Sequence, residues 1–526
     1  MRLRWLPSRT APTWPSRGDL LAGPSVALVL IPQSLAYAEL AGVPPERGLF
    51  TAAAAPAIAA IAGSSRYLQS GPVALTSLLT LGALAPLMAT GTAEYAAHAA
   101  LLAILVGIIR VLLGLLRGGA LSYLMSQPVV AGFTVGAAML IVASQLPTLL
   151  GVSAGADNPL VGGWLAITAV DQWQLGPVLL GLSTIAILLG GRKLHALFPG
   201  ALLATVAGVI LGATGFGGAQ VGAISGGLPL PSLDLPWASV GALLIPAVVI
   251  ALVGFAEPAA IARRYAAQDD EPWNANREFV GQGAANLASG LLSGYSVGGS
   301  FSRTALNRLS GATSRWSAVF TGLWVLVLLP LAPLLSTLPT AVLAGLVIAA
   351  AISLVEIRPF REYWRWSLPQ FGVAVPTLIL TLLLAPRVEL AVLVGVGLAI
   401  AVHLWREFRV DIDSWRRGQE LHIQLHGVLY FGSAPEVERK LRAALAAQPD
   451  AGELVLHLDR VGRLDLTAVL VLRNVLDRVA GEGMPCRFAG IAPSAERLVR
   501  KVLRDDATAR SVSPGSNTAA PDTAST

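Results

Sequence analysis

Long apolar segments recur from about residue 20 to about residue 403, and each is long enough to cross a lipid bilayer. A helix needs about 20 apolar residues to span a hydrocarbon core about 30 Å thick, and residues 240–261 and 317–338 are two such stretches. The chain has 54% hydrophobic and only 13% charged residues, against about 25% charged residues in soluble domains. These features predict a polytopic α-helical membrane protein and exclude a single membrane anchor.

Hydropathy and the positions of glycine and proline predict fourteen transmembrane segments. Their centres lie near residues 28, 56, 76, 105, 138, 183, 206, 250, 286, 306, 326, 346, 376 and 396. With the basic segment 1–18 in the cytoplasm, this count leaves only Arg47 and Arg387 in outside loops, as the positive-inside rule requires. We therefore expect a protein of the inner (plasma) membrane with both termini in the cytoplasm.

Two of the fourteen segments differ from the rest. The third, QSGPVALTSLLTLGALAP from Gln69, and the tenth, GGSFSRTALNRLSGA from Gly298, are short and rich in hydroxyl groups, and both begin with Ser/Gly turns. Short, interrupted spans at corresponding places in two halves are typical of an inverted-repeat transporter whose substrate site lies between broken helices at the bilayer midplane. The alternative is a pair of re-entrant or interfacial segments with no common site.

The composition changes after Trp405, where charged residues return. The stretches LHIQLHGVLYF, ELVLHLD and PCRFAGI are strand-like, and PEVERKLRAALAA, TAVLVLRNVLDRVAG and SAERLVRKVLR are helix-like. The expected organisation is a cytoplasmic segment 1–18, a transmembrane domain 19–405, a small α/β domain 406–506 and a disordered Ser/Thr/Ala/Pro-rich tail 507–526. An even number of spans places the α/β domain in the cytoplasm.

Three stretches resemble the sulfate permease (SulP) family of anion transporters: DLLAGPSVALVLIPQSLAYAELAGVPPERGLF, GSSRYLQSGPVAL at the third segment and GGSFSRTALNRLSGATS at the tenth. The C-terminal domain is similar to the STAS domain of that family, so the resemblance runs from Asp19 to about Arg504. It implies a seven-plus-seven inverted repeat divided into a core and a gate domain, usually in a homodimer. It also implies that the anion lies between the N-termini of the third and tenth helices.

The chemistry of these two segments supports an anion site. A half-helix that begins at mid-membrane presents unpaired N–H groups and a partial positive charge, so two facing ends can hold an anion. Pro72 suits the first position of a helix. Ser70, Ser300 and Ser302 can cap a helix or donate hydroxyl groups to an oxyanion. The predicted substrate-binding residues are Gln33, Tyr37, Gln69, Ser70, Gly71, Val73, Ala74, Gly299, Ser300, Phe301, Ser302 and Arg303.

Arg303 is the most informative of these residues. A cation near the bilayer centre costs about 2.5–3.5 kcal/mol on insertion scales, so it normally faces a polar cavity and marks an ion pathway. Its guanidinium would attract a carboxylate or a sulfate. Two alternatives are a permanent pair with an acid such as Glu257, and an extended side chain that reaches the cytoplasmic face near Arg308. Among the other polar residues, Gln33, Tyr37 and Gln69 either line the cavity or bond neighbouring helices.

Two acids, Glu39 and Glu257, lie on predominantly apolar segments and are the candidates for proton coupling. The resemblance places an acidic residue of the eighth segment, here Glu257, toward the substrate. Sodium-coupled relatives tend to surround an aspartate there with extra hydroxyl and carbonyl ligands, whereas Pro258 and two alanines follow Glu257. This difference favours protons over sodium. The alternative for Glu39 is a solvated helix end near Glu46.

Metal, redox and cofactor sites are not expected. Cys486 is the single cysteine and cannot form an intramolecular disulfide. His422 and His426 lie four residues apart on a predicted strand, about 13 Å apart and too far to share a metal ion, and we interpret both as exposed. Thr467 follows the strand where soluble STAS proteins carry a phosphorylatable Ser or Thr, but its neighbours depart from their DSSG-like pattern. We interpret Thr467 as a helix cap.

The sequence therefore predicts a secondary anion transporter and not an enzyme. Its leading form is proton symport of a sulfate-like, bicarbonate or dicarboxylate anion by an elevator-like alternating-access motion. Sodium symport, anion exchange and an uncoupled channel are alternatives, as is a membrane-anchored anion sensor that signals through the STAS-like domain. The expected partners are a small anion, a coupling proton or sodium ion, the lipid bilayer, a second copy of the chain and a cytoplasmic regulator of the STAS-like domain. No nucleic-acid signature is present, and the cytoplasmic loops explain the net charge of +6.

Overall fold

The computed structural model describes residues 14–502 apart from 124–125, 154, 157, 196, 225, 228–229, 408–409, 492–497 and 500. Residues 1–13 of the predicted segment 1–18, most of the last predicted helix and the whole predicted tail 507–526 lie outside the described residues. The chain separates into two compact units, Met1–Ala399 and Ile400–Thr526.

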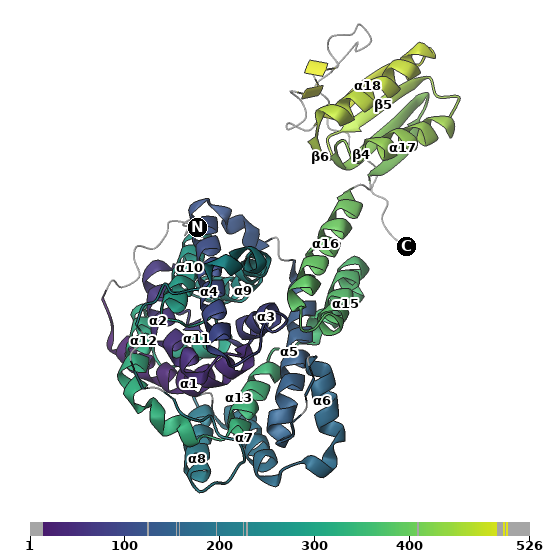
Figure 1. Ribbon diagram of the computed structural model, residues 1–526. Coiled ribbons are helices and arrows are strands. Elements are labelled where there is room, and N and C mark those ends of the chain that lie inside the picture. The colour runs from purple at the N-terminus through teal and green to yellow at the C-terminus, as the bar shows by residue number, and fades with distance from the viewer. Residues whose placement is uncertain are drawn as a thin grey trace. The chain divides into compact units, whose positions relative to one another are not determined.

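The first unit is helical (Figure 1). Its first half contains α1 (Arg17–Ala41), α2 (Pro45–Ala62), α3 (Ala74–Leu84), α4 (Ala93–Leu115), α5 (Gln127–Leu150), α6 (Pro159–Thr168), α7 (Leu175–Leu194) and α8 (Gly200–Ala213). Its second half contains α9 (Val240–Gln268), α10 (Ala275–Leu291), α11 (Phe301–Leu309), α12 (Trp316–Leu328), α13 (Thr340–Ile352), α14 (Arg358–Trp366), α15 (Leu368–Leu383) and α16 (Val388–Glu407). Each predicted segment centre lies within one of these helices.

Two helices were not predicted, α6 and α14. The first is a short apolar helix, and the second is a basic, aromatic helix with no buried residue. Without these two, seven helices run from α1 to α8 and seven from α9 to α16. The order repeats: α1 and α9 each carry two internal prolines, and the third helix of each half, α3 or α11, is short and follows a two-residue strand. This is the predicted inverted repeat.

Six helices in the described part of the chain are long and apolar enough to span a bilayer by length and composition. They are α1, α4, α5, α9 with the 3-10 turn before it, α12 with the 3-10 segment after it, and α16. Shorter apolar helices include α3, α6, α7, α8, α13 and α15. A multi-pass membrane protein follows from this set.

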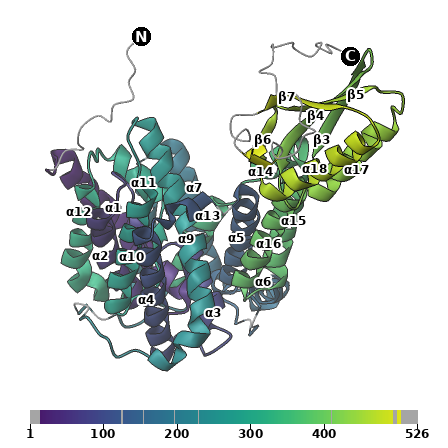
Figure 2. The same ribbon diagram turned by 90° about the horizontal axis from the view of Figure 1, so that it is seen from above.

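The helices pack in two groups, which Figures 1 and 2 show side by side. The core group consists of α1–α4 and α9–α12, and the gate group of α5–α8 and α13–α16. Glycines allow close approach inside each group: a Cβ at Gly283 of α10 would stand 2.7 Å from the Val111 nitrogen of α4. In the gate group, a Cβ at Gly136 of α5 would stand 2.8 Å from Thr381 Cβ of α15. Small residues at such contacts are typical of helix packing in membranes.

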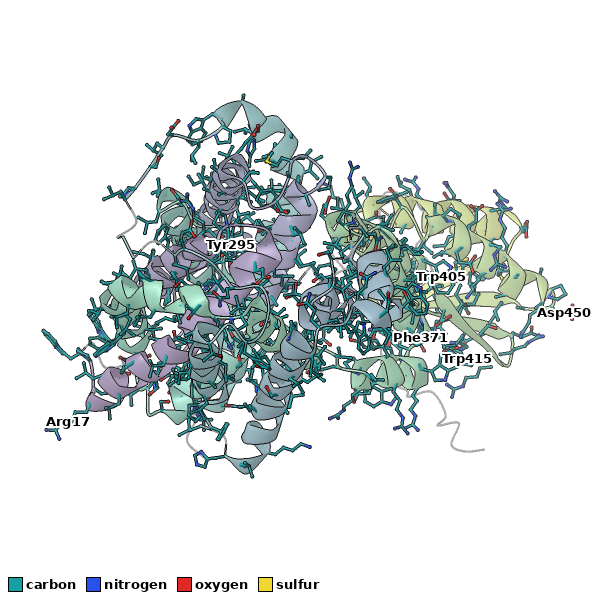
Figure 3. The ribbon with its side chains drawn as sticks, turned by 60° about the horizontal axis from the view of Figure 1, so that its bottom comes forward. Arg17, Tyr295, Phe371, Trp405, Trp415 and Asp450 are labelled. Carbon is teal, nitrogen blue, oxygen red and sulfur yellow. The ribbon has the colours of Figure 1, made fainter. Side chains whose placement is uncertain are left out.

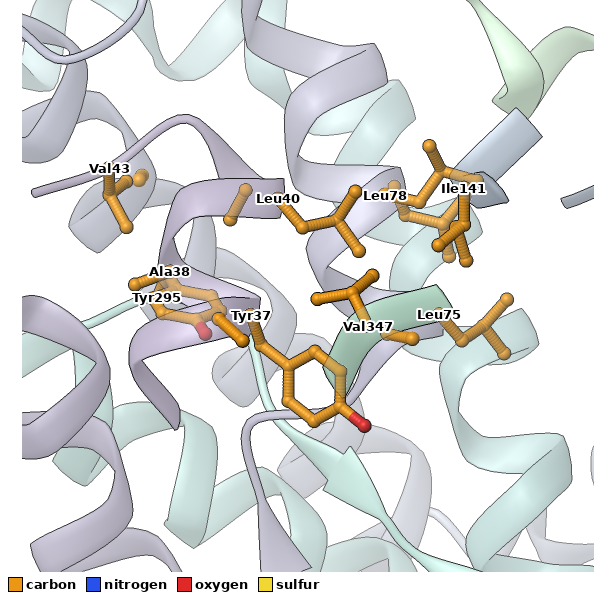
Figure 4. Close-up of a cluster of buried hydrophobic side chains, with 14 of the residues drawn as sticks. Tyr37, Ala38, Leu40, Val43, Leu75, Leu78, Ile141, Tyr295 and Val347 are labelled. Carbon is orange, nitrogen blue, oxygen red and sulfur yellow. The ribbon is translucent and has the colours of Figure 1, made fainter. Parts of the chain in front are cut away.

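Larger apolar side chains fill the seam between the two groups (Figure 4). The core group contributes Tyr37, Ala38 and Leu40 of α1, Leu75 and Leu78 of α3, and the loop residues Val43 and Tyr295. The gate group contributes Ile141 of α5 and Val347 of α13. Ile141 and Val347 are completely buried. The seam beside α3 is therefore packed with apolar side chains.

The second unit is an α/β domain. Its strands are β3 (Asp411–Arg417), β4 (Glu420–Leu429), β5 (Glu453–Leu458), β6 (Val461–Leu464) and β7 (Cys486–Ile491), and its helices are α17 (Ala434–Ala446) and α18 (Leu466–Gly481). The order is β3-β4-β5-β7, with β6 paired to β4 and only the β3–β4 pair antiparallel. Leu421, Ile423 and Leu425 alternate along β4 and pack with Leu441 of α17 and Leu472 of α18.

Two strands of this domain, β3 and β6, were not predicted. The first is charged and mostly exposed, so it shows no apolar alternation, and it forms a hairpin with β4 through Gly418 in the left-handed region (φ 64°). The second has only four residues. Cross-strand pairing, rather than local composition, places both strands in the sheet.

The interpretation of His422 as an exposed residue is wrong. His422 is 8% exposed because its ring stacks on Trp415 of β3 and its Nδ1 lies 3.0 Å from Nε2 of His457 on β5. Burial lowers the pKa of His457. His426 is half-buried and bonds Asp413 at 2.8 Å. No group of three or more His, Cys, Asp or Glu that could hold a metal ion occurs among the described residues.

The interpretation of Thr467 as a helix cap is also wrong. The cap of α18 is Asp465, whose Oδ1 accepts the N–H of Ala468 at 2.8 Å and whose Oδ2 accepts the N–H of Phe431 at 2.9 Å. Thr467 is exposed in the first helical turn. An aspartate two residues earlier reaches the unpaired amides better because a cap must lie just outside the helix.

Asp465→Ala is expected to destabilise the start of α18 by about 1 kcal/mol, the usual cost of losing a cap. Hydrogen–deuterium exchange of the full-length protein should show faster exchange at the first-turn amides of α18. Thr467→Ala is the matched control and should leave that exchange unchanged. Equal effects of the two substitutions would contradict the assignment of the cap.

Candidate functional site

The third helix of each half begins at the same short piece of sheet. The strands β1 (Ser70–Gly71) and β2 (Gly298–Gly299) pair antiparallel, with α3 starting just after β1 and α11 directly after β2. The Ser300 N–H also donates to the Gln69 carbonyl at 3.1 Å. Two helix N-termini, each with unpaired N–H groups and a partial positive charge, thus lie beside one buried strand pair.

The two N-termini are capped differently. The helix α3 begins at Ala74 after Val73, which makes no side-chain cap bond, so the prediction of Pro72 as first helical residue is wrong by two positions. The backbone needs those two residues to leave the strand pair. In α11 the cap is Ser300, whose Oγ accepts the N–H of Arg303 at 3.4 Å. Ser302 lies inside the helix, with its Oγ 3.3 Å from that of Ser300.

Arg303 is buried, with 1% of its surface exposed. Its Nη1 donates to Oε1 of Gln33 at 3.2 Å, while Nε and Nη2 have no hydrogen-bond partner among the residues that the structure describes. Gly71 leaves space beside this free edge, since a Cβ there would stand 3.6 Å from Nη2. Among the described residues no carboxylate lies within ion-pair distance of Arg303. The guanidinium is therefore neither paired with Glu257 nor extended to the surface.

Gln69 adds a second group without a partner. Its backbone N–H donates to Thr304 Oγ1 at 3.0 Å, but neither atom of its completely buried side-chain amide is hydrogen-bonded within the described part of the chain. Buried amides are normally satisfied, so these atoms have capacity for a ligand or water. The neighbouring Ser70 is different, because its Oγ accepts Nε2 of Gln282 at 2.7 Å.

Glu257 of α9 joins this site. Its carboxyl group interacts with the backbone N–H of Phe301, the first residue of α11, and with the charge of Arg303. Tyr37 of α1 and Tyr295, which Figure 3 labels inside the helical unit, also interact electrostatically with Arg303. Three elements thus bring polar side chains, two phenols and one carboxyl group, to the guanidinium.

Glu39 does not join this site. It lies at the last turn of α1, half-buried, and its carboxyl group forms no hydrogen bond or ion pair with the described residues. The sequence analysis names both Glu39 and Glu257 as candidates for proton coupling. The structure brings only Glu257 to the helix N-termini.

The other predicted substrate-binding residues form one connected set around the strand pair. The buried ones are Gln33, Tyr37, Gln69, Ser70, Gly71, Val73, Ala74, Gly299, Ser300 and Arg303. Phe301 and Ser302 are exposed at the start of α11. Gly299 has no room for a side chain, since a Cβ would meet Leu68 Cδ1 at 2.8 Å and Pro258 Cα at 3.1 Å.

Four residues that position this site were not predicted from the sequence: Arg110, Gln282, Asn286 and Thr304. Gln282 and Asn286 lie one turn apart on α10, where they bond Ser70 and Val297 respectively. Both are polar residues in a predicted membrane span and lie four positions apart, on one face of the helix, and this pattern could have identified them from the sequence. Arg110 is a lone charge in an apolar span, which also marks a functional position.

Two seven-helix halves, with one short helix from each half starting at a shared pair of short strands, define the class of inverted-repeat membrane transporters. Residues 17–377 match the model of the sulfate permease family, and residues 412–507 match the STAS domain. The chain belongs to the sulfate permease family of anion transporters.

Individual relatives agree with this assignment. A probable sulfate transporter of Mycobacterium tuberculosis is 34% identical over 516 residues, which cover 92% of this chain and 91% of the relative. A sodium-independent sulfate anion transporter of Bos taurus is 30% identical over 541 residues, covering 94% and 87%. The inward-facing structure of the murine solute carrier 26 family member A9 anion transporter superposes with a TM-score of 0.85 at 19% identity, covering 95% and 90%. These relatives are transporters, not enzymes.

Proposed function

We propose that this protein carries an oxyanion, with sulfate as the first candidate and bicarbonate or a dicarboxylate as alternatives. The observation that carries the proposal is the free edge of Arg303. Nε–H and Nη2–H of one guanidinium form two parallel donors, which match two oxygens of a carboxylate, bicarbonate or sulfate better than they match a single halide ion. The N-termini of α3 and α11 add partial positive charge at the same place.

We also propose that Glu257 couples transport to protons. Its carboxyl group interacts with the charge of Arg303 and with the backbone N–H of Phe301, the first residue of α11. A proton on Glu257 removes a negative charge that would repel the incoming anion. Proton and anion then favour each other's binding, and this coupling is reciprocal.

The movement that we propose is a displacement of the core group along the gate group, of the elevator type. Glycines bring helices close inside each group, and Leu, Ile, Val and Tyr side chains fill much of the seam (Figure 4). Few directional bonds across an apolar seam must break when the core group moves, so the seam favours sliding of the core group as one unit along the gate group. The anion site belongs wholly to the core group and would move with it.

The test is uptake of radiolabelled sulfate, bicarbonate and fumarate into liposomes that contain the purified protein. An inward proton gradient should drive accumulation of at least one of these anions, with a sodium gradient as control. Accumulation driven only by sodium would show a sodium symporter, and exchange without accumulation an anion exchanger. Chloride flux without flux of any oxyanion would overturn the oxyanion proposal. Binding without flux would favour an anion sensor that signals through the STAS domain.

We propose that residues 406–506 form a cytoplasmic domain outside the permeation path, and that two copies of the chain assemble. The return of charged residues after Trp405 and the even number of spans support the cytoplasmic location. We also propose that this domain binds a cytoplasmic regulator.

Topology gives a direct prediction. In a Cys486→Ser background, Asp450→Cys, which lies near Gln448 on an exposed loop, should not react with an impermeant thiol reagent added to intact cells (Figure 3). The same variant should react in inside-out vesicles. Arg387→Cys, exposed in a loop predicted to lie outside, is the matched control and should react in intact cells. The reverse pattern would contradict the proposed topology.

A further inference from the structure

Arg110, near the end of α4, is a completely buried cation. Its guanidinium donates to three backbone carbonyls: Nε to Ala251 at 3.1 Å, Nη2 to Ile250 at 3.0 Å and Nη1 to Val297 at 3.0 Å. Ala251 and Ile250 belong to α9, and Val297 directly precedes β2. Arg110 thus ties α4, α9 and the entry to the anion site together.

The charge of Arg110 is not neutralised nearby. No carboxylate within the described ranges forms an ion pair with it, and its partners are carbonyl dipoles only. A buried charge is normally paired because its desolvation costs several kcal/mol, and arginine does not lose its proton in proteins. A full positive charge therefore remains inside the core group.

The position of this charge is directly behind the strand pair. Gly254 of α9 touches the guanidinium, since a Cβ there would stand 2.6 Å from Arg110 Nη2 and 3.1 Å from Thr76 Cγ2 of α3. On the other side, the Gly254 carbonyl lies 3.7 Å from where a Cβ of Gly298 would be. Arg303 approaches the same strand pair at Gly71. Arg110 and Arg303 thus flank β1 and β2.

We propose that Arg110 is a positioning residue that also supplies a second, permanent positive charge to the anion site. This inference rests on the proposed function. Arg303 binds the anion directly, while Arg110 acts through the buried backbone and through its field, which is weakly screened in a low-dielectric interior. The expected consequence is a preference for divalent over monovalent anions.

Asn286 offers a matched control. Its Oδ1 accepts the Val297 N–H at 3.0 Å and its Nδ2 donates to the Val297 carbonyl at 3.3 Å, so it anchors the same backbone as Arg110 without carrying a charge. A substitution at Asn286 removes the anchor and keeps the field. A neutral substitution at Arg110 removes both.

The experiment measures equilibrium binding of sulfate and of perchlorate, two tetrahedral oxyanions of different charge, to purified full-length protein. Arg110→Gln should weaken both anions by a common factor from the lost anchor and should weaken sulfate binding about tenfold more than perchlorate binding, because the field energy doubles with the charge of the anion. Arg110→Met replaces it if the glutamine variant does not fold. Arg110→Lys and Asn286→Ala keep the charge and should weaken both anions by one common factor.

Equal factors for the two anions in the neutral Arg110 variant, or unchanged affinities, would overturn the inference and leave only a structural role. That outcome is distinct from failure of the proposed function, in which the parent protein itself would bind neither anion.

Discussion

Arg303→Ala is expected to weaken oxyanion binding by about a hundredfold, the value of two charge-assisted hydrogen bonds in a buried site. The physical reason is that Nε and Nη2 are buried donors that bond no group of the described residues, at the point where α11 begins. Arg303→Lys should recover only part of the loss because an ammonium group restores the charge without the two parallel N–H bonds.

Isothermal titration of the purified variants with sulfate measures these effects. The matched control is Arg308→Ala on the same helix, because Arg308 is partly exposed and bonds Asp269 and Gln268 away from the strand pair. Its sulfate affinity should remain close to that of the parent. An Arg303→Ala variant that binds and carries sulfate like the parent would show that the anion site lies elsewhere.

Glu257→Gln is expected to abolish accumulation of substrate against its gradient while exchange of substrate across the membrane persists. Glutamine has the shape of the protonated acid, so the anion still enters, but no proton is taken up or released with it. Uptake into liposomes with an imposed proton gradient gives the accumulation, and exchange of labelled for unlabelled substrate without a gradient gives the second readout.

Glu39→Gln is the matched control for this experiment. Glu39 lies on an apolar helix, and its carboxyl group forms no hydrogen bond or ion pair with the described site residues, so this variant should accumulate substrate like the parent. If Glu39→Gln loses accumulation and Glu257→Gln retains it, the assignment of the coupling acid is wrong. If both variants accumulate substrate like the parent, coupling to protons through either residue is excluded.

The sequence predicted the membrane architecture well because the evidence for it is local. An apolar span must satisfy its own backbone groups as a helix, so hydropathy placed all the predicted centres inside helices. The short helices α3 and α11 were also predicted from local composition, because their segments are short, rich in hydroxyl groups and begin with Ser/Gly turns. The alternating patterns of β4 and β5 were also readable locally.

Details that depend on a distant partner were missed or left open. The cap of α18 at Asp465 rather than Thr467, the start of α3 two residues after Pro72, and the strand β3 follow from pairing with other parts of the chain. Burial of His422 follows from Trp415 and His457 on adjacent strands.

The amino-acid sequence by itself determined which segments cross the membrane and which residues are chemically suited to an anion. Only the tertiary structure decided which of those residues meet: it joined Gln33 and Glu257 to Arg303, left Glu39 apart, and placed Arg110 behind the strand pair. The physical reason is the distance along the sequence over which each interaction acts. Hydrophobic burial and helix formation are set by neighbouring residues, whereas the fate of a buried charge depends on groups more than a hundred positions away, such as Val297 for Arg110.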